Sequence, residues 1–292
     1  MMPDRYLKYA LLAPAFLICA ATLFYPLIQS FWYSLHDWNI GQQATVGNFV
    51  GLENYWNLLT DDPAFWISVK VTLLFTVPSV FLTIALSLGM AMLLAGSGPI
   101  EINARTLLVI PFAMSPALIG VSWRFLLNPE FGAADAALKL LFPSLADTPI
   151  LSHPTMAMIA LIAVDLWHWV PYFMLTFIGA LAGLPQDTID AAQIDGAGRI
   201  RTFFEVILPQ LFPVVAIALL LKTIFSLKML DQVVTMTAGG PGTATDTLSH
   251  VIFTTAFRWY DIGYGSAIAY FLAIVMMILA MLYSRFVLGR TA

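Results

Sequence analysis

Long uncharged stretches alternate with short charged segments along this chain. Residues 9–35, 71–100 and 262–284 contain no Asp, Glu, Lys or Arg. A helix that crosses a bilayer needs about 20 mostly apolar residues. The pattern therefore predicts six membrane-spanning helices, near residues 9–33, 70–95, 106–127, 155–183, 210–231 and 264–287. A membrane β-barrel would need extended alternation of apolar and polar residues, and the sequence does not show it.

The composition supports the same interpretation. Hydrophobic residues make up 60% of the 292 residues and charged residues 10%, whereas soluble proteins are about 45–50% apolar and about 25% charged. The net charge of −4 does not favour nucleic acid as a partner. Cys19 is the single cysteine, which excludes an internal disulfide and a cysteine metal cluster. We expect an all-α membrane protein whose single transmembrane domain covers residues 1–292.

The first apolar stretch resembles a signal peptide because Arg5 and Lys8 precede it. Its apolar run is too long for a signal peptide, however, and no small-x-small cleavage site follows. Ile18 rather than a small residue precedes Cys19, which does not suit lipoprotein cleavage. We therefore expect this stretch to be a membrane span of the mature protein.

Positive charge in the loops predicts the orientation of the chain, because cytoplasmic loops are enriched in Lys and Arg. One set of loops and both termini carry most of these residues: Arg5, Lys8, Arg105, Arg199, Arg201, Arg285 and Arg290. The opposite loops carry Lys139 and Arg258. Both termini are therefore predicted to be cytoplasmic.

The cytoplasmic loop 184–209 has the pattern of an ordered structure. Pro185 and the acids that follow it suit the first turn of a short helix, and Gly196 interrupts that helix. Apolar residues at positions 200, 203, 204, 207 and 208 then form one stripe of an amphipathic helix lying at the membrane interface. Pro209 is expected to break the chain before the fifth span.

This loop resembles the EAA motif of binding-protein-dependent ABC importer permeases, in particular the carbohydrate branch. The residues in register with that motif are Asp190, Ala191, Ala192, Gly196, Val206, Leu208 and Pro209. Asp190 replaces the usual Glu and Val206 the usual Ile. In that family the loop is a coupling helix that docks on a cytosolic ATPase, and this role is what the resemblance implies here.

Other segments extend the resemblance over nearly the whole chain. The segment 51–55 resembles the family's approach to its second span, and 237–242 resembles the external loop before the last span in maltose-type and glycerol-phosphate-type permeases. Gly132 and Leu138 resemble another external motif of the family, in which Asp135 replaces the usual Asn.

The resemblance implies a type I ABC importer permease fold in a bacterial inner membrane. It also implies a second homologous permease subunit, two cytosolic ATPase subunits and an extracytoplasmic solute-binding protein, in addition to the solute and the surrounding membrane lipid. The chain has no GxxxxGK[ST] loop. ATP and Mg²⁺ are therefore expected on the partner ATPase, with no cofactor, metal or catalytic residue in this chain.

Polar and aromatic residues lie inside the fourth predicted span. Asp165, His168, Trp169 and Tyr172 share one helical face, and a charge at this depth faces a cavity or a partner. In one interpretation this face, with Lys222 of span five, lines a path for a sugar. In the other, Asp165 pairs with Lys222 or Arg124 to hold the helices together, and the Trp residues form an interfacial belt.

These observations predict a permease subunit for a sugar, sugar derivative or polyol, which makes and breaks no bond itself. One alternative is a self-contained secondary transporter, but no convincing internal repeat is present. The other is an intramembrane enzyme using Asp165 and His168, but no HExxH or Ser/His/Asp set supports it. The sequence leaves open which solute is carried.

Overall fold

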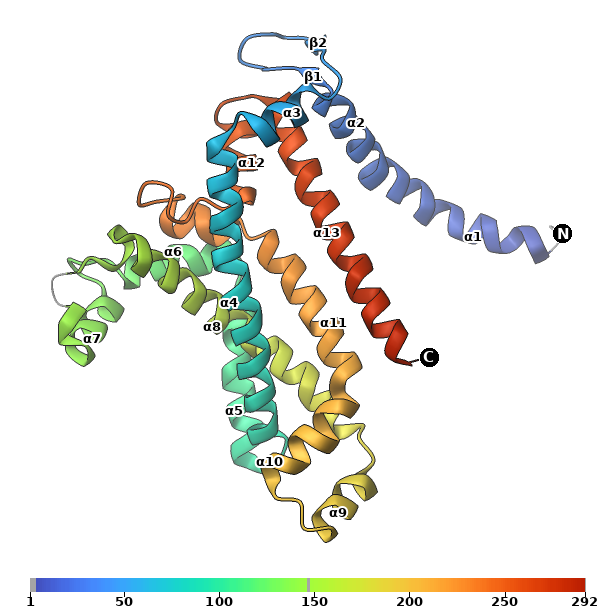
Figure 1. Ribbon diagram of the computed structural model, residues 1–292, viewed down its shortest axis with the longest axis vertical. Coiled ribbons are helices and arrows are strands. Elements are labelled where there is room, and N and C mark those ends of the chain that lie inside the picture. The colour runs from blue at the N-terminus through green and yellow to red at the C-terminus, as the bar shows by residue number, and fades with distance from the viewer. Residues whose placement is uncertain (1–3, 146–147, 292) are drawn as a thin grey trace. The chain divides into compact units, whose positions relative to one another are not determined.

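The computed structural model describes residues 4–145 and 148–291 as an almost entirely helical chain (Figure 1). The residues fall into two compact units. The first comprises residues up to Phe65 together with Val251–Ile274, and the second comprises Trp66–His250 and the residues from Val275 onward.

The first unit is built from the N-terminal helices and a small hairpin. Its elements are α1 (Asp4–Cys19), a π-helical turn (Ala20–Phe24), α2 (Tyr25–Ser34), β1 (His36–Asp37), β2 (Asn48–Phe49) and α3 (Glu53–Thr60). The two strands are antiparallel, with His36 opposite Phe49. The amide of Asn54 donates to the carbonyls of Ser34 and His36, at 2.9 and 3.0 Å, and so ties α3 to the strand. Most of α12 (Leu248–Phe257) and the first part of α13 (Ile262–Thr291) complete this unit.

The second unit holds most of the helices. Its elements are α4 (Pro63–Leu94, most of it), α5 (Pro99–Val109), α6 (Pro116–Leu126), α7 (Ala133–Leu141), α8 (Pro154–Ala182), α9 (Gln186–Ile194), α10 (Arg199–Thr202) and α11 (Leu208–Leu227). Single 3₁₀ turns occupy Ile110–Ala113, Pro143–Leu145 and Ile150–Ser152, and π-helical turns occupy Phe203–Ile207 and Val233–Thr237.

Helix lengths agree with the predicted spans, with one correction. Within the described ranges, five helical runs are long and apolar enough to cross a membrane: Leu11–Ser34, Pro63–Leu94, Pro154–Ala182, Arg199–Leu227 and Ile262–Arg285. The third predicted span, 106–127, is not one straight helix. It starts earlier, at Pro99, and consists of two helical segments that meet at 97°. Counted as one broken span, this pair brings the total to six.

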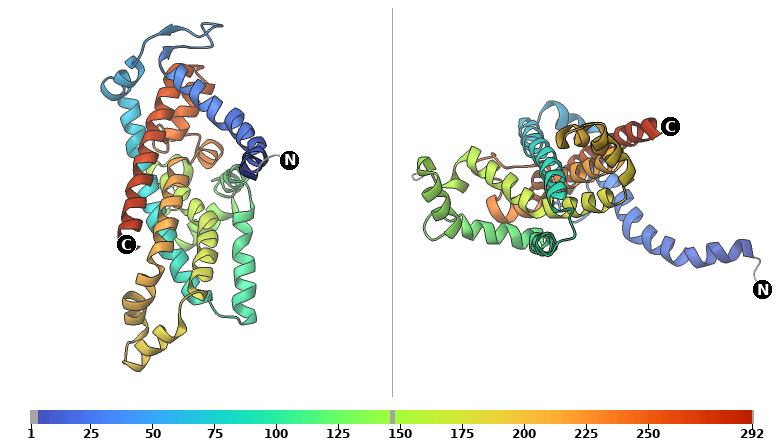
Figure 2. Two further views of the ribbon diagram at one scale, coloured as in Figure 1. Left: turned by 90° about the vertical axis from the view of Figure 1, so that its right-hand side faces the viewer. Right: turned by 90° about the horizontal axis from the view of Figure 1, so that it is seen from below.

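Two prolines account for this bend. Pro111 lies in the 3₁₀ turn that ends α5, and Ser115 is extended because a residue before proline avoids the helical region. Ser115 then caps α6, its hydroxyl accepting from the amide of Leu118 at 3.3 Å, and Pro116 occupies the first turn. In the right-hand view of Figure 2, α5 is seen along its axis whereas α6 lies across the view.

Two apolar clusters form the core of the second unit. The first gathers Phe75, Ile119, Leu161, Val233 and Met236, among others, from α4, α6, α8 and the π-helical turn that follows α11. The second gathers Ile84, Phe173, Phe177, Leu211 and Val215, among others, from α4, α8 and α11.

A polar layer separates these clusters. Ser79 lies on α4 between Phe75 and Ile84, and Asp165 lies on α8 between the residues that join the two clusters. Lys222 occupies the corresponding position on α11. Each of the three helices therefore contributes a polar side chain at the same level of the bundle, and these side chains are buried.

One face of α4 carries a column of small hydroxyl residues. Every third or fourth residue is a buried Ser or Thr: Ser68, Thr72, Thr76, Ser79, Thr83 and Ser87. Thr72 and Ser87 bond to main-chain atoms, the former to the carbonyl of Ser68 at 2.7 Å and the latter to the carbonyl of Val170 at 2.9 Å. Such small side chains allow helices to approach closely within a membrane.

Candidate functional site

The polar layer is organised around Asp165. Its Oδ2 atom accepts from Lys222 Nζ at 2.6 Å and from the hydroxyl of Ser79. The Lys222 side chain is fully buried, and that of Asp165 is 3% exposed. These contacts tie α4, α8 and α11 together. The sequence left two cations as possible partners of Asp165. The structure pairs it with Lys222, whereas Arg124 is exposed.

His168 joins the same layer to the bend between α5 and α6. It is buried, and its Nδ1 atom lies 3.1 Å from the carbonyl oxygen of Pro111. Because a carbonyl only accepts, the His168 Nδ1–H group donates this bond. Pro111 precedes the break in the third span, so the imidazole provides a hydrogen bond for a carbonyl where the regular helix ends.

Aromatic rings cover one side of the layer. Trp169 stacks on Phe225 with ring centroids 4.6 Å apart and an interplanar angle of 15°. Tyr172 stacks on Phe112 at 4.8 Å and 26°. Lys222 Nζ lies 5.5 Å from the centre of the Trp169 ring, within the range of a cation–π contact. The four residues predicted to share a face of α8 therefore do so, and each has partners from other segments.

A cavity of about 210 Å³ opens beside Asp165 and Trp169. Its other polar lining residues are Lys228, Asp231 and Gln232, which follow α11. Asp231 and Gln232 were not singled out from the sequence. Phe225 also lines it. A larger cavity of about 400 Å³, near Trp123, Leu138 and Trp167, is lined by apolar and aromatic side chains and offers no comparable polar groups.

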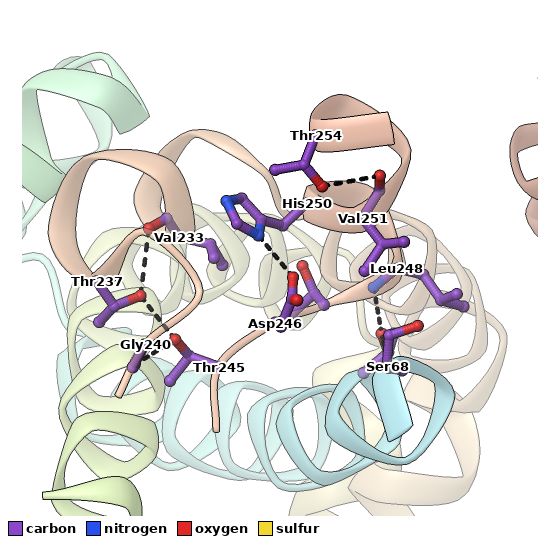
Figure 3. Close-up of polar contacts among 12 residues, drawn as sticks. Ser68, Val233, Thr237, Gly240, Thr245, Asp246, Leu248, His250, Val251 and Thr254 are labelled. Atoms are coloured by element: carbon purple, nitrogen blue, oxygen red, sulfur yellow. Dashed lines mark hydrogen bonds and ion pairs between the residues drawn. The ribbon is translucent and has the colours of Figure 1, made fainter. Parts of the chain in front are cut away.

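The segment after α11 continues into a tightly bonded loop, seen in Figure 3. The Thr245 hydroxyl donates to the carbonyl of Gly240 at 2.7 Å and lies 2.8 Å from the hydroxyl of Thr237. His250 Nδ1 lies 2.6 Å from a carboxylate oxygen of Asp246. Gly239 has φ +83°, a conformation that favours glycine. The loop that resembled an external motif is therefore an ordered turn.

Loop 184–209 contains the short helix and the glycine bend expected from its sequence. Pro185 precedes α9, and Gly196 has φ +81°, which only glycine adopts without strain. Asp190 and Ala191 are exposed, whereas Ala192 is half-buried. Asp190 accepts from the amide of Gln186 at 3.3 Å. This helix therefore presents an acidic side chain next to a small one.

The expected break at Pro209 was wrong. α10, the π-helical turn and α11 form one helical run from Arg199 to Leu227, in which Pro209 is the second residue of α11. The wider π-helical turn immediately before it accommodates a residue that lacks an N–H donor. The predicted stripe is also divided: Ile207 is buried in the core, whereas Ile200 and Phe204 are 77% and 60% exposed.

Within residues 4–145 and 148–291, no group of three or more His, Cys, Asp or Glu side chains is placed so that it could hold a metal ion.

Comparison with known proteins decides the family. Residues 45–289 match the family described as "Binding-protein-dependent transport system inner membrane component". The chain belongs to this family. It is a transmembrane permease subunit of a binding-protein-dependent ABC importer, and it is a transport subunit rather than an enzyme. Family membership implies partner ATPase subunits and a solute-binding protein.

Two relatives match the permease over almost its whole length. The sulfoquinovosyl glycerol transport system permease protein SmoG of Agrobacterium fabrum is 31% identical over 97% of this chain and 91% of its own. The trehalose/maltose transport system permease protein MalF of Thermococcus litoralis is 32% identical over 97% of this chain and 94% of its own.

A solved structure confirms the fold. The permease superposes with a TM-score of 0.82 on a chain of a bacterial ABC transporter involved in the import of the acidic polysaccharide alginate. That likeness covers 98% of this chain and 96% of the other at 18% sequence identity. The type I ABC importer permease fold expected from the sequence is therefore confirmed.

Proposed function

We propose that this permease carries a sugar, sugar derivative or polyol across a bacterial inner membrane, with both termini in the cytoplasm. It would work beside a second, homologous permease subunit, with two ATPase subunits on the cytoplasmic side of the membrane and a solute-binding protein on the opposite side. The names of the relatives support the solute class, since they refer to a sugar glycoside and to disaccharides. The excess of Lys and Arg in the loops on one side supports the orientation.

Loop 184–209 is proposed as the contact with the ATPase. The residues assigned to this contact are Asp190, Ala191, Ala192, Gly196, Leu208 and Pro209. In support, α9 lies at the end of the second unit remote from α6 and α7 (Figure 1), and most of its side chains are exposed. Small Ala191 allows close approach of another surface, and Asp190 offers a partner for a cation.

The solute path is proposed along the polar and aromatic face of α8. Trp169 and Tyr172 would contact the solute, because aromatic rings stack on the C–H faces of sugars, and both are only half-buried. Asp165, Lys222 and His168 hold one another or the main chain. They would keep this face in place beside the cavity.

One observation carries the proposal most directly. The helical run from Arg199 to Leu227 connects the proposed ATPase contact to Lys222 and Phe225 without interruption. A displacement at its cytoplasmic end is transmitted to the polar layer by a single helix. Movement of a rigid helix of this kind is one of the ways in which two conformations interconvert.

Solute uptake by the assembled importer tests both parts of the proposal. Asp190→Lys is expected to abolish uptake while the complex still assembles, whereas the matched change Asp190→Glu is expected to retain it. Trp169→Ala and Tyr172→Ala are expected to reduce uptake without reducing assembly. Full uptake by Asp190→Lys would reject the coupling role, and full uptake by both aromatic variants would reject the path.

Deletion of the partner ATPase separates an ATP-driven importer from a secondary transporter. Uptake should stop in its absence. Uptake that persists and follows an ion gradient would favour the self-contained transporter instead.

A further inference from the structure

The cavity beside Trp169 contains charges of both signs. The lining carboxylates of Asp165 and Asp231 are accompanied by the ammonium of Lys228, and Lys222 lies behind Asp165 at 2.6 Å. Taken with Lys222, the four formal charges sum to zero. Lys222 is fully buried and bonded to Asp165, so its charge is already compensated before any solute enters.

The wall of this cavity includes hydrogen-bond acceptors that a solute hydroxyl group could use. Gln232 is 2% exposed, and within residues 4–145 and 148–291 its Oε1 atom has no hydrogen-bond partner. Asp231 adds an ionised carboxylate, which only accepts. A buried acceptor without a donor is unfavourable. A hydroxyl group of an incoming solute would donate to the Asp231 carboxylate, which is exposed and lines the cavity.

The shape of the cavity limits the occupant. Its volume of about 210 Å³ is below the range of about 300–1,000 Å³ that is usual for ligand pockets. The stacked rings of Trp169 and Phe225 supply an apolar wall. These dimensions suit one ring, or a short polyol, with hydroxyl groups at its edge and C–H groups on its face.

We propose that this cavity selects a neutral polyhydroxylated unit and rejects an anionic one, and that Asp165 and Asp231 determine the selection. An anion would place a further negative charge beside the Asp231 carboxylate, while the Asp165 carboxylate cancels the attraction that Lys222 would otherwise exert on it. Asp165 acts by cancelling the charge of Lys222. This inference rests on the proposed function, and it names the charge class of the solute at the proposed path.

The expected selection can be measured on the assembled importer in lipid nanodiscs without knowing the natural solute. The probes are methyl α-glucoside, which is neutral, and glucose 6-phosphate, which is anionic, at equal concentration. Saturation-transfer difference NMR detects weak binding of each. Wild-type importer is expected to give a signal for the glucoside that Trp169→Ala abolishes, and at most a weak signal for the phosphate.

Removal of one carboxylate should shift the preference. Asp231→Asn is expected to raise the phosphate signal severalfold relative to the glucoside signal, and Asp165→Asn should do the same by exposing the charge of Lys222. Asp231 is exposed, so its variant keeps the test valid even when Asp165→Asn fails to fold. Glu130→Gln removes an exposed carboxylate that does not line the cavity, and it should leave the ratio unchanged.

Three results would overturn the proposal. These are equal binding of both probes to wild type, no Trp169-dependent glucoside signal, and an unchanged ratio in Asp231→Asn. The proposed function has a separate readout, since ATPase-dependent uptake of the natural solute can persist when the charge selection fails. Loss of that dependence would instead reject the function on which the inference rests.

Discussion

Removal of the Lys222 ammonium should destabilise the permease more than removal of any surface cation. Lys222→Ala leaves the Asp165 carboxylate in the bundle with the hydroxyl of Ser79 as its one remaining side-chain donor among the described residues. Breaking a buried ion pair by removing one partner costs about 3–5 kcal/mol. Domains are stable by only about 5–15 kcal/mol, so we expect a large loss of folded protein.

The exposed pair Arg201–Glu205 provides the matched control. Its side chains are 65% and 60% exposed, and its N–O distance of 2.8 Å is close to that of the buried pair. Exposed pairs contribute about 0–1 kcal/mol. Arg201→Ala should therefore have almost no effect on stability, although it removes the same kind of contact.

Unfolding of the purified permease in mixed detergent and SDS micelles measures these differences. Asp165→Leu combined with Lys222→Met replaces both charges by apolar groups and should recover most of the stability lost in the single variants, because neither charge is then left alone. Equal stability of Lys222→Ala and Arg201→Ala would refute the stabilising role of the buried pair. A double variant that loses as much stability as the two single variants added together would refute it as well.

Three further predictions follow from glycines and exposed loop positions. Gly196→Ala should reduce uptake while the complex still assembles, because φ +81° is strained for alanine; normal uptake would show that the bend is not needed. Gly120→Ala should lower stability by about 1–3 kcal/mol in the same SDS assay, because its Cβ would lie 1.9 Å from Thr235 Oγ1. A Cβ at Gly179 meets nothing within 4 Å, so Gly179→Ala should be neutral in that assay. The third prediction uses a variant whose exposed Cys19 is replaced by Ser. Single cysteines placed at the exposed positions Asn48 and Thr243 should react with an impermeant thiol reagent from outside. A single cysteine at Thr188 should react only after permeabilisation. External labelling at Thr188 would reverse the predicted orientation.

Apolar runs predicted the spans well, because length and absence of charge are what a bilayer requires of a helix. They could not predict the 97° bend within the third span, since prolines within a span are compatible with a kink, a bend or a straight continuation. Pro209 illustrates the same limit in the opposite direction. A π-helical turn precedes it, and the helix continues where a break was expected.

The candidate site was only partly predictable. Helical periodicity placed Asp165, His168, Trp169 and Tyr172 on one face, and the structure agrees. Helical periodicity could not decide whether Lys222 or Arg124 is the partner of Asp165, because the sequence of either helix alone does not determine how two distant helices are aligned. Asp231 and Gln232 were missed because they follow α11 in a segment that has no apolar periodicity.

The buried pair also affects how the chain enters the membrane during synthesis. Asp165 precedes Lys222 by 57 residues, so α8 is made before its counter-charge exists. An Asp at the centre of a spanning helix opposes insertion by about 2.5–3.5 kcal/mol on translocon scales, and α8 has the lowest mean hydropathy of the five long spans, 1.5 against 2.1–2.3. Ser79, synthesised 86 residues before Asp165, is available as its first partner. In nascent chains truncated before α11, α8 should therefore be inserted in the bilayer less completely than in chains that extend beyond Lys222.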